Sequence, residues 1–516
     1  MQDKLILTHN LGTTGCKAVI YDQRGRVVRV WLSNYRTNYA NGNRVEQNSE
    51  HWWNAVCEST RNVMRGIHEK SIIAVSFSGQ MMGCLCLDKA GKPLQDAFIW
   101  ADMRAAKESK HLHEMIDESQ FYRITGHRIS SAYTLSKLLW IKNNQPDIYH
   151  RIHKVVQAKD YIVYRLTGRV VTDYTDATGT NLFDLTRGEW SRTILSMTGI
   201  ERDILPEVVL STDIVGTVTM DAAEETGLLP GTPVVIGAGD GLCSAIAGTC
   251  TQPDDAYLYF GSSAWIGLTK NQPYWDSELR TFNWAHVIPQ LYSPCGTMQA
   301  AGVSIDWARD QIAWLENSQA QVQHCKTQDL VDLEILHSPP GANGLLFLPY
   351  LLGERSPYWD PSVKGTLIGL RKKHSRADLL RSFIEGVALN LKIIWDSLQP
   401  VITAKELIVV GGQGTSPVNR QIIADVLGIP VKSHNHLLDS KNFGAAILGG
   451  IGTGMYGHID EVKQMVNFQG ICEPNAENHR YYNDLLPYFE RSYHAVKDVY
   501  TEMDKFHSQR KIGVDV

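Results

Sequence analysis

The chain has 516 residues, of which 50 are basic and 55 acidic, so its formal net charge at pH 7 is −5. At this length more than one domain is expected, and the 43% of hydrophobic residues is typical of a globular protein. The slightly acidic balance argues against a protein that follows nucleic-acid backbones, so we expect no nucleic-acid partner.

The sequence also argues against a membrane protein and a secreted one. The charge-free stretch at residues 443–457 is interrupted by six glycines and falls short of the roughly 18 apolar residues that a spanning helix needs. The N-terminus lacks the cationic lead and long apolar core of a signal peptide. Nine cysteines are scattered without the spacing of a disulfide framework or a metal site. We therefore expect a cytoplasmic enzyme with free thiols.

The first predicted elements are a strand, a tight turn and a second strand. Residues 5–9 and 18–21 are extended and apolar, and the turn between them is rich in Gly and Thr. Ser49 is the predicted N-cap of a helix whose apolar residues recur at helical spacing. Around this helix we predict strands and then one mostly helical segment: strands at 27–32, 72–77 and 84–87, and helices across about 104–195.

The second half of the chain repeats the opening plan. Residues 257–260 and 264–269 are extended and flank a Gly-Ser-Ser turn, as the first two strands flank their own turn. We therefore predict two domains on one plan, residues 1–252 and 253–516. Strands at 233–236 and 407–410 and a helix opened by Ser375, with Asp378 completing a capping box, make the protein α/β.

Three small-residue loops follow predicted strands. Glycine lets the backbone approach an anion closely, and hydroxyl and backbone N–H groups can hold phosphate oxygens. Each loop by itself is more typical of a plain tight turn, but three in one chain favour a nucleotide site. None ends in the Gly-Lys-Ser/Thr of a P-loop. The loops are Gly12-Thr13-Thr14, Gly261-Ser262-Ser263 and Gly411-Gly412-Gln413-Gly414.

The segment that begins at Val234 also resembles the opening of a dinucleotide-binding fingerprint. Its third small position fails, because Leu242 stands where Gly or Ala is expected. A nicotinamide-dependent oxidoreductase is therefore the alternative class that loop chemistry alone leaves open.

Asp240 follows a buried strand and precedes a small-residue helix. One interpretation is a helix N-cap. The other is a general base, because a carboxylate beside a phosphate-binding turn can take a proton from a hydroxyl that attacks a γ-phosphoryl group.

Trp100, Asp102 and Arg104 form a second cluster after an apolar strand. An indole face with one carboxylate and one guanidinium suits a polyol, although a surface ion pair beside a core Trp fits the spacing equally well. The pair Trp52-Trp53 is more typical of a helix core and rim than of a binding platform.

In collinear order over about residues 5–455, these motifs resemble the FGGY carbohydrate kinases, and within that family the xylulokinase-like members. The matching segments are Leu11-Gly12-Thr13-Thr14 with Lys17, Val45-Glu46-Gln47 before Trp52-Trp53, Gly79-Gln80-Met81, Trp100 with Asp102 and Arg104, Lys159-Asp160-Tyr161, Leu166-Thr167-Gly168, Asp176-Ala177, Gly239-Asp240, Gly261-Ser262-Ser263, Gly411-Gly412, and a C-terminal signature at 365–386 in which Phe383 is out of pattern.

The resemblance implies two actin-like domains of the ribonuclease H type, a helical insert, and an active site in the cleft between the domains. It implies ATP-dependent, Mg²⁺-assisted phosphorylation of a sugar or polyol hydroxyl, with Asp240 as the general base. The family often forms homodimers. Its implied ATP-binding residues are Gly12, Thr13, Thr14, Lys17, Gly261, Ser262, Ser263, Gly302, Gly411, Gly412, Gln413 and Ser416. Its implied substrate-binding residues are Gln80, Met81, Met82, Trp100, Asp102, Arg104, Asp240 and Gly241.

Three positions depart from the family pattern. Asn10 stands where the first loop usually begins with Asp, which should weaken a contact to the metal or its waters. Met82 replaces a His, and Gly241 replaces an Asn, so two groups that could hydrogen-bond a sugar hydroxyl are absent.

We therefore expect a kinase for a ketopentose, xylulose first, with gluconate or another polyol or sugar acid as the alternative substrate. A binding protein of the same fold without turnover is a further alternative, supported by Asn10 and opposed by Asp240.

Overall fold

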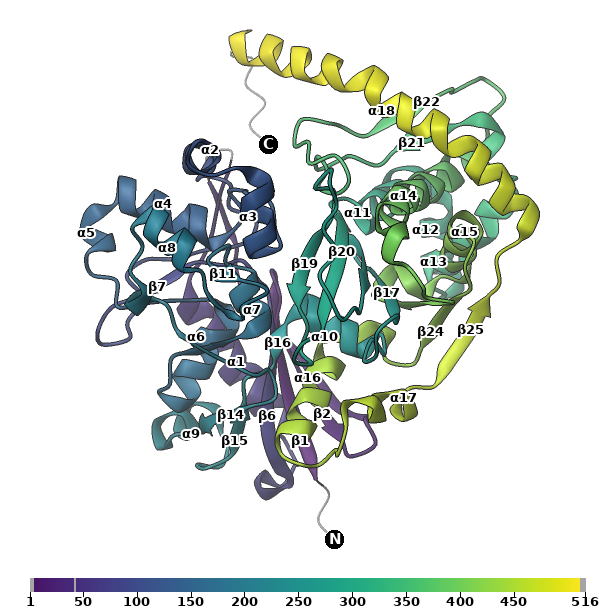
Figure 1. Cartoon of the computed structure of the whole chain (residues 1–516). Coiled ribbons are helices and arrows are strands. Elements are labelled where there is room, and N and C mark those ends of the chain that lie inside the picture. The colour runs from purple at the N-terminus through teal and green to yellow at the C-terminus, as the bar shows by residue number, and fades with distance from the viewer. Residues whose placement is uncertain (1–3, 41–42, 511–516) are drawn as a thin grey trace. The chain divides into compact units, whose positions relative to one another are not determined.

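The computed structural model describes residues 4–40 and 43–510 of the chain (Figure 1). Its contacts divide the chain into two compact units, each assembled from three stretches. The first unit comprises residues 1–253, 269–293 and 439–466, and the second comprises 254–268, 294–438 and 467–516. The division into domains at residue 252 that the sequence suggested stays a prediction.

The first unit is built on a seven-stranded sheet in the order β14-β15-β6-β1-β2-β3, with β16 also paired to β6. The predicted strand-turn-strand opening is confirmed as β1 and β2, which pair antiparallel, while β1 pairs with β6 in parallel. The strands are β1 (Leu5–Leu11), β2 (Gly15–Asp22), β3 (Val27–Asn34), β6 (Ile72–Gly79), β14 (Ile214–Thr217), β15 (Pro233–Val235) and β16 (Ala238–Gly239).

Successive side chains of β1 point to opposite faces of the sheet, and on both faces they pack against helices. Leu5 and Leu7 belong to a core with α1 (Ser49–Val63), whose Trp52 and Trp53 are 2% and 1% exposed. Ile6 belongs to a different core, formed with α10 (Asp240–Ala247) and α16 (Ser440–Gly452). Both tryptophans are therefore core residues, as their pairing suggested, and neither forms a rim.

The cap of α1 differs by one residue from the prediction. Asn48, not Ser49, is the N-cap, and its side chain accepts a hydrogen bond from the backbone N–H of Glu50. Asn and Ser are comparable caps, so the sequence pattern could not separate two neighbouring candidates.

The mostly helical segment between about residues 104 and 195 is confirmed and has its own hydrophobic core. Its helices are α2 (Ala106–Met115), α3 (Glu118–Thr125), α4 (Thr134–Asn144), α5 (Pro146–Tyr149), α6 (Ala158–Thr167), α7 (Tyr174–Thr178) and α8 (Arg192–Thr198), with α9 (Met220–Thr226) beyond them. Short strands of the same unit are β4 (Asn38–Ala40), β5 (Arg44–Gln47), β7 (Leu85–Leu87), β8 (Ala97–Phe98), β9 (Lys154–Val156), β10 (Val171–Asp173), β11 (Phe183–Asp184), β12 (Glu189–Trp190), β13 (Glu207–Val209) and β19 (Phe282–Ala285).

The second unit repeats the plan of the first. Strands β17 and β18 form an antiparallel pair, and β17 pairs in parallel with β23, as β1 does with β6. The sheet runs in the order β20-β18-β17-β23-β24-β25. Its strands are β17 (Ala256–Phe260), β18 (Ala264–Leu268), β20 (Tyr292–Met298), β23 (Leu407–Val410), β24 (Val431–His434) and β25 (Phe468–Cys472), with β21 (Leu346–Leu348) and β22 (Thr366–Ile368) forming a separate pair.

The helices of the second unit include α14, whose predicted capping box of Ser375 and Asp378 is confirmed. They are α11 (Gly302–Ile312), α12 (Trp314–Gln323), α13 (Thr327–Ile335), α14 (Arg376–Leu398), α15 (Pro417–Leu427) and α18 (Ala476–Arg510); α17 (Val462–Met465) lies at the end of the first unit.

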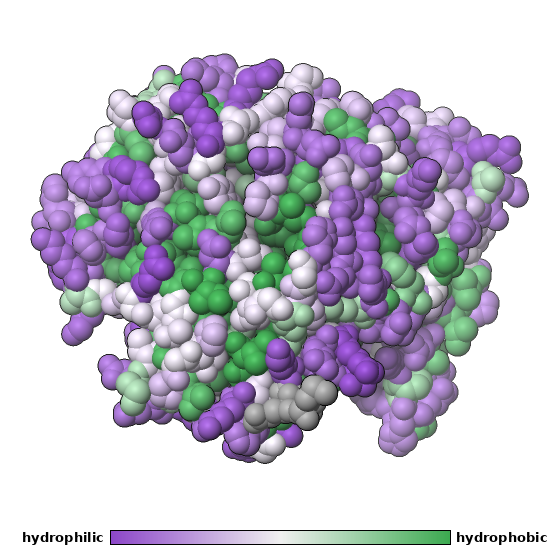
Figure 2. All heavy atoms as spheres, turned by 60° about the horizontal axis from the view of Figure 1, so that its bottom comes forward, coloured by the Kyte–Doolittle hydropathy of each residue, from purple (hydrophilic) through white to green (hydrophobic). Residues whose placement is uncertain are grey.

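Polar side chains cover much of the surface shown in Figure 2, with hydrophobic residues in groups between them. Among the helices of residues 4–40 and 43–510, none is long and apolar enough to cross a membrane.

Candidate active site

Three strand ends of the first unit lie side by side. Leu11 of β1 is in register with Gly79 of β6, and Gly79 is in register with Gly239 of β16. Both pairings are parallel, so the residues that follow the three strands emerge at one edge of the sheet. The sheet therefore brings together the first loop, the Gln80-Met81 segment and Asp240, which are far apart in the sequence.

Asp240 is the first residue of α10, and the N-cap is Gly239, so the N-cap interpretation of this carboxylate is wrong. One carboxylate oxygen, Oδ2, accepts a hydrogen bond from Nζ of Lys441 on α16 at 2.7 Å. The side chains of Asp240 and Lys441 keep 24% and 20% of their surface exposed. Within the part of the chain that the structure describes, no other hydrogen bond to this carboxylate is found, so Oδ1 is available to a ligand.

In the first loop the backbone carbonyls are held by the protein. The Tyr35 hydroxyl donates to the carbonyl of Gly12 at 2.5 Å, and Gln47 Nε2 donates to that of Thr13 at 2.6 Å. The backbone N–H of Tyr35 donates to the carbonyl of Thr14 at 3.1 Å.

By contrast, the N–H groups of Thr13 and Thr14 have no acceptor among the residues that the structure describes. Successive free N–H groups in a turn form an anion-binding concavity. Lys17, on the strand after the loop, forms an ion pair with Asp439.

In the second loop, too, the backbone carbonyls are hydrogen-bonded within the protein. The carbonyl of Gly261 accepts from the N–H of Gly302 at 3.0 Å, and that of Ser262 accepts from Val303 at 3.1 Å. The carbonyl of Ser263 accepts from the N–H of Gly261 at 3.0 Å. No acceptor for the N–H of Ser262 or Ser263 is found in the described ranges, so this loop also points two donors outward.

Gly302 is needed for this second loop. A Cβ at Gly302 would lie 2.3 Å from the carbonyl oxygen of Gly261 and 2.9 Å from Cγ of Gln413. Gly302 therefore joins the second loop to the third, and a side chain there would separate them.

The third loop follows β23 and opens α15. Gly411 has φ of +102°, and a Cβ there would lie 2.6 Å from the carbonyl oxygen of Phe260. Gly412 has open space at its Cβ position, and Gln413 donates from Nε2 to Asp306 at 3.1 Å. Ser416 is the N-cap of α15 and its hydroxyl donates to Asp332, so this side chain is engaged in the fold.

The residues predicted to face the sugar lie just beyond β6. Gln80 donates from Nε2 to Gln47 Oε1 at 2.7 Å, while its own buried Oε1 has no hydrogen-bond partner in the described part of the chain. Met81 is 6% exposed and packs on Gly239, because a Cβ there would lie 2.5 Å from its sulfur. Met82 has a left-handed backbone with φ of +65°. Gly241 has open space at its Cβ position.

The Trp-x-Asp-x-Arg cluster is a buried network. Asp102 is fully buried and accepts from the backbone N–H of Val45 at 2.7 Å, while Arg104 pairs with both Asp102 and Glu46. Burial lowers the pKa of Arg104, but its hydrogen bonds to Asp102 and Glu46 raise it above the ordinary value. The interpretation as a surface ion pair is therefore wrong. Trp100 Nε1 donates to Thr13 Oγ1 at 3.0 Å, which ties the cluster to the first loop.

Asn10, the departure in the first loop, lies on β1 opposite Lys17 on β2. Its Oδ1 is buried and has no hydrogen-bond partner within residues 4–40 and 43–510. An amide oxygen in this state can accept a hydrogen bond from a metal-bound water or bind a hard cation directly. Among the same described residues, no group of three or more His, Cys, Asp or Glu side chains is placed to hold a metal ion.

Three residues that hold the site were not selected from the sequence. Gln47 was quoted only as part of a motif, yet its side chain contacts Thr13, Gln80 and Trp52. Lys441 pairs with Asp240 from 201 residues away, and Lys137 donates from Nζ to the carbonyl of Met82 at 2.9 Å. Only Gln47 carried a local signal, its place in the Val-Glu-Gln motif.

Two family models match this chain. The N-terminal domain of the FGGY family of carbohydrate kinases matches residues 5–247, and the C-terminal domain of the same family matches residues 256–453. The chain belongs to the FGGY family of carbohydrate kinases. It is therefore a sugar kinase, and its fold is the two-domain, actin-like fold of these enzymes.

Named relatives fall into two groups. The chain is 31% identical over 515 residues to a xylulose kinase of Staphylococcus epidermidis, which covers 98% of this chain and 99% of the relative. It is 30% identical to a gluconokinase of Bacillus licheniformis, with 96% and 97% covered.

Two of the solved structures that match represent the same two classes. A ligand-bound xylulose kinase from Lactobacillus acidophilus matches with a TM-score of 0.89 at 27% identity, covering 97% of this chain and all of that one. A gluconate kinase from the same organism matches with a TM-score of 0.89 at 26% identity and equal coverage. The comparisons thus support a small-molecule sugar substrate and leave two acceptor classes.

Proposed function

We propose that this FGGY kinase transfers the γ-phosphoryl group of ATP to a hydroxyl of a ketopentose, with xylulose as the first candidate. The observation that carries the proposal is the Asp240 carboxylate, which lies at the carboxyl end of β16 and has one oxygen without a hydrogen-bond partner in residues 4–40 and 43–510. Xylulose kinases are also among the relatives with 30% identity or more and near-complete coverage.

In this proposal Asp240 is the general base. Its Oδ1 accepts the proton of the acceptor hydroxyl as that oxygen forms a bond to the γ-phosphorus, and the bond between the γ-phosphorus and the bridging oxygen of ADP breaks. Lys441 holds the other oxygen, Oδ2, so the carboxylate is already oriented before the acceptor arrives.

The loops supply the phosphate contacts. The outward N–H groups of Thr13 and Thr14, and of Ser262 and Ser263, are donors suited to phosphate oxygens. Gly411, Gly412 and Gln413 are proposed to lie near adenosine. Ser416 is proposed to act there by capping α15, because its hydroxyl is already bonded to Asp332.

The residues of the first loop fit a divalent metal. Asn10 Oδ1 is a buried oxygen near the end of β1 that has no hydrogen-bond partner among the described residues, and we propose that it accepts from a water bound to Mg²⁺. Mg²⁺, when bound, neutralises charge on the transferred phosphoryl group.

Gluconate is the second candidate acceptor. Gluconate kinases match this chain almost as well as xylulose kinases do, and the partly exposed ammonium of Lys441 beside the base is a cation that an acid substrate could approach. Gly241 and Met82 offer no polar side-chain atom other than a thioether, so neither favours one acceptor through hydrogen bonds.

Sugar-stimulated ADP release tests the proposal. The full chain with Mg²⁺ and ATP is presented with D- and L-xylulose, D- and L-ribulose, gluconate, glycerol and tetritols. We expect turnover with D-xylulose above the others, and its absence in Asp240→Asn. Preference for gluconate would transfer the proposal to the second acceptor. Silence across the panel with ATP still bound would contradict the kinase proposal for these acceptors and favour a binding protein.

A cytoplasmic location and a homodimer, both expected from the sequence, stay predictions.

A further inference from the structure

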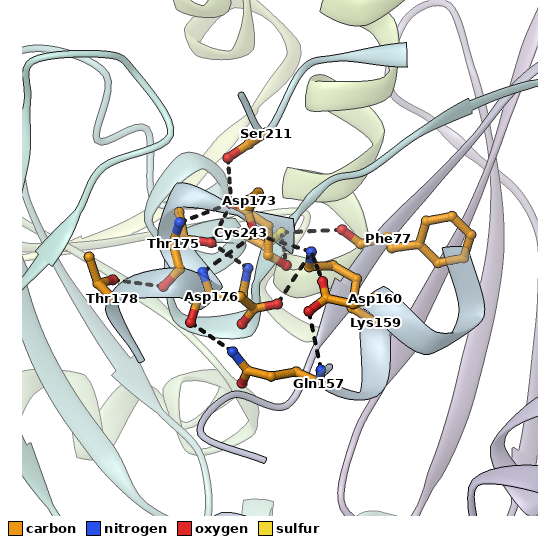
Figure 3. Close-up of polar contacts among 12 residues, drawn as sticks. Phe77, Gln157, Lys159, Asp160, Asp173, Thr175, Asp176, Thr178, Ser211 and Cys243 are labelled. Carbon is orange, nitrogen blue, oxygen red and sulfur yellow. Dashed lines mark hydrogen bonds and ion pairs between the residues drawn. The ribbon is translucent and has the colours of Figure 1, made fainter. Parts of the chain in front are cut away.

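The first unit contains a buried polar network of Lys159, Asp160, Asp173 and Asp176, which connects to Asp240 through Thr175 and Gly239. The reaction proposed above does not use these side chains directly. Figure 3 shows the side chain of Lys159 pointing toward the carboxyl groups of Asp160, Asp173 and Asp176. The Nζ–oxygen distances are 3.1, 3.1 and 3.3 Å, and the four side chains are at most 1% exposed.

The protonation of this network follows from its charges. Burial lowers the pKa of Lys159, but the carboxyl groups, Asp173 first, raise it well above its usual value, so Lys159 is charged. Three carboxylates around one ammonium would leave a buried excess of negative charge. Burial, with the neighbouring carboxyl groups of Asp160 and Asp173, raises the pKa of Asp176 well above its usual range.

Asp173 is the carboxyl group of this network that accepts the hydrogen bonds linking it to Thr175 and Ser211. Its Oδ2 accepts from Ser211 Oγ at 2.7 Å, from Thr175 Oγ1 at 2.7 Å and from the N–H of Thr175 at 3.1 Å. Its Oδ1 faces Lys159 at 3.1 Å (Figure 3). A carboxylate with several donors holds its charge and its orientation.

The Thr175 hydroxyl connects this carboxylate to the active site. The backbone N–H of Gly239 donates to Thr175 Oγ1 at 2.8 Å. A hydroxyl has one hydrogen, and because an N–H can only donate, Thr175 must accept from Gly239 and give its own hydrogen to Asp173. The carboxylate of Asp173 therefore decides which way the hydroxyl points.

Gly239 is the N-cap of α10, and the next residue is Asp240. Its backbone thus sets the direction in which the Asp240 side chain leaves the sheet edge. The same network supports the neighbouring strand end, because a Cβ at Gly79 would lie 2.9 Å from Cβ of Lys159.

We propose that Thr175 is a positioning residue for the phosphoryl transfer: its hydroxyl, oriented by Asp173, fixes the backbone of Gly239 and so holds the Asp240 carboxylate beside Lys441 and the acceptor hydroxyl. The inference rests on the proposed function, since Asp240 is taken as the base. It predicts an effect on turnover rather than on binding, because Thr175 is fully buried and its hydroxyl bonds Gly239 and Asp173 within the protein.

The test compares three variants of the full chain. Thr175→Val removes the hydroxyl at nearly constant volume, and Thr175→Ser restores it. Thr178→Val is the matched control, because Thr178 is a buried threonine of the same helix whose hydroxyl donates to the backbone carbonyl of Thr175 rather than to a carboxyl group (Figure 3). Melting temperatures, kcat and KM are measured with the acceptor that gives the highest turnover in the wild-type panel.

We expect Thr175→Val to lower kcat about 10- to 100-fold with KM for the acceptor within about twofold, since small displacements of a reacting group have effects of this size. Thr175→Ser should stay within about threefold of wild-type kcat, as should Thr178→Val. A Thr175→Val enzyme with kcat like that of Thr178→Val, or a serine variant as slow as the valine variant, overturns the proposal.

A further variant and the wild-type activity provide two additional tests. If Thr175→Val does not fold, Ser211→Ala removes one donor from Asp173 while leaving Thr175 intact. A fall in its kcat of about threefold with constant KM supports the proposal, and an unchanged kcat contradicts it. Wild-type protein that turns over no acceptor would contradict the proposed function itself, whereas wild-type turnover with an unaffected Thr175→Val contradicts only the role of Thr175.

Discussion

The first loop of each unit has its backbone carbonyls hydrogen-bonded within the protein, but the donors of these bonds differ between the two units. Around Gly12-Thr13-Thr14, two carbonyls are bonded by the side chains of Tyr35 and Gln47. Around Gly261-Ser262-Ser263, all three carbonyls are bonded by backbone N–H groups, two of them from the start of α11. One plan has therefore been stabilised by side chains in the first unit and by main chain in the second.

The charges differ as well. In the first unit Asp240 follows a strand end beside the loop and pairs with Lys441, whereas in the second unit Asp306 of α11 pairs with Arg309 and accepts from Gln413. In the proposed function the acid-base chemistry therefore comes from the first unit, through Asp240. Mutations should thus affect the two units differently, and the following predictions run from the largest effect to the smallest.

Removing the charge of Asp240 should have the largest effect. We expect Asp240→Asn to lower kcat by about 10³-fold or more, because an amide cannot take the acceptor proton. Nucleotide affinity, measured by calorimetry, should stay within a few fold. Asp221→Asn is the control, since Asp221 also lies in the first turn of a helix, α9. If Asp240→Asn and the control were equally active, Asp240 would not be the general base.

Breaking the second loop requires a change near the main chain. Gly302→Ala would place a Cβ 2.3 Å from the carbonyl oxygen of Gly261, so we expect kcat/KM for ATP to fall about 100-fold with the acceptor KM little changed. Gly386→Ala is the matched control, because its Cβ would meet the carbonyl of Phe347 at 2.1 Å in the same unit. If both variants lose stability but neither changes the KM for ATP, the second loop does not hold the nucleotide.

The first loop should yield to a single side-chain change. Gln47→Leu removes the donor to Thr13 and the acceptor for Gln80, and we expect kcat/KM for ATP to fall about 10- to 30-fold. Tyr35→Phe, which loses only the bond to Gly12, should fall by a few fold. Unchanged kinetics in both would show that the loop keeps its shape without these side chains.

Gln47 also shows how far the sequence carries. Both strand-turn-strand units follow from patterns a few residues long, and the motifs select the loops and Asp240 correctly as the residues at strand ends. The contacts that hold them do not follow, because they join distant positions: Gln47 lies 34 residues from Thr13, and Lys441 lies 201 residues from Asp240.

Two predictions failed because the alternatives have similar energies or the same sequence spacing. Asn48 and Ser49 are comparable caps, so the start of α1 was misplaced by one residue. The spacing of Asp102 and Arg104 is the same in a buried ion pair and in a surface pair, and only the packing of Val45 and Glu46 around them decides.

Replacing Asn10, for which we propose a contact to a metal-bound water, should have a smaller effect. Asn10→Asp puts a charged oxygen where Oδ1 is now buried and unpartnered among the described residues, so we expect the Mg²⁺ concentration for half-maximal activity to fall by a few fold. Magnesium titration at saturating ATP measures this, with Mn²⁺ as a second metal. An unchanged Mg²⁺ requirement and unchanged turnover would show that Asn10 makes no contact with the metal or its waters.

The smallest effect concerns stability, through a side chain that again holds a carbonyl of the first unit. Burial lowers the pKa of Lys137, which donates to the carbonyl of Met82, to about 7. Unfolded protein keeps this proton up to about pH 10, so between pH 7 and 10 it binds more protons than native protein and the free energy of unfolding rises with pH. This group contributes at most about 1.4 kcal/mol per pH unit, and no slope below pH 7. Denaturant unfolding at pH 7, 8 and 9 should show the slope in wild type and a smaller one in Lys137→Met; equal slopes would mean that Lys137 stays charged in the folded protein.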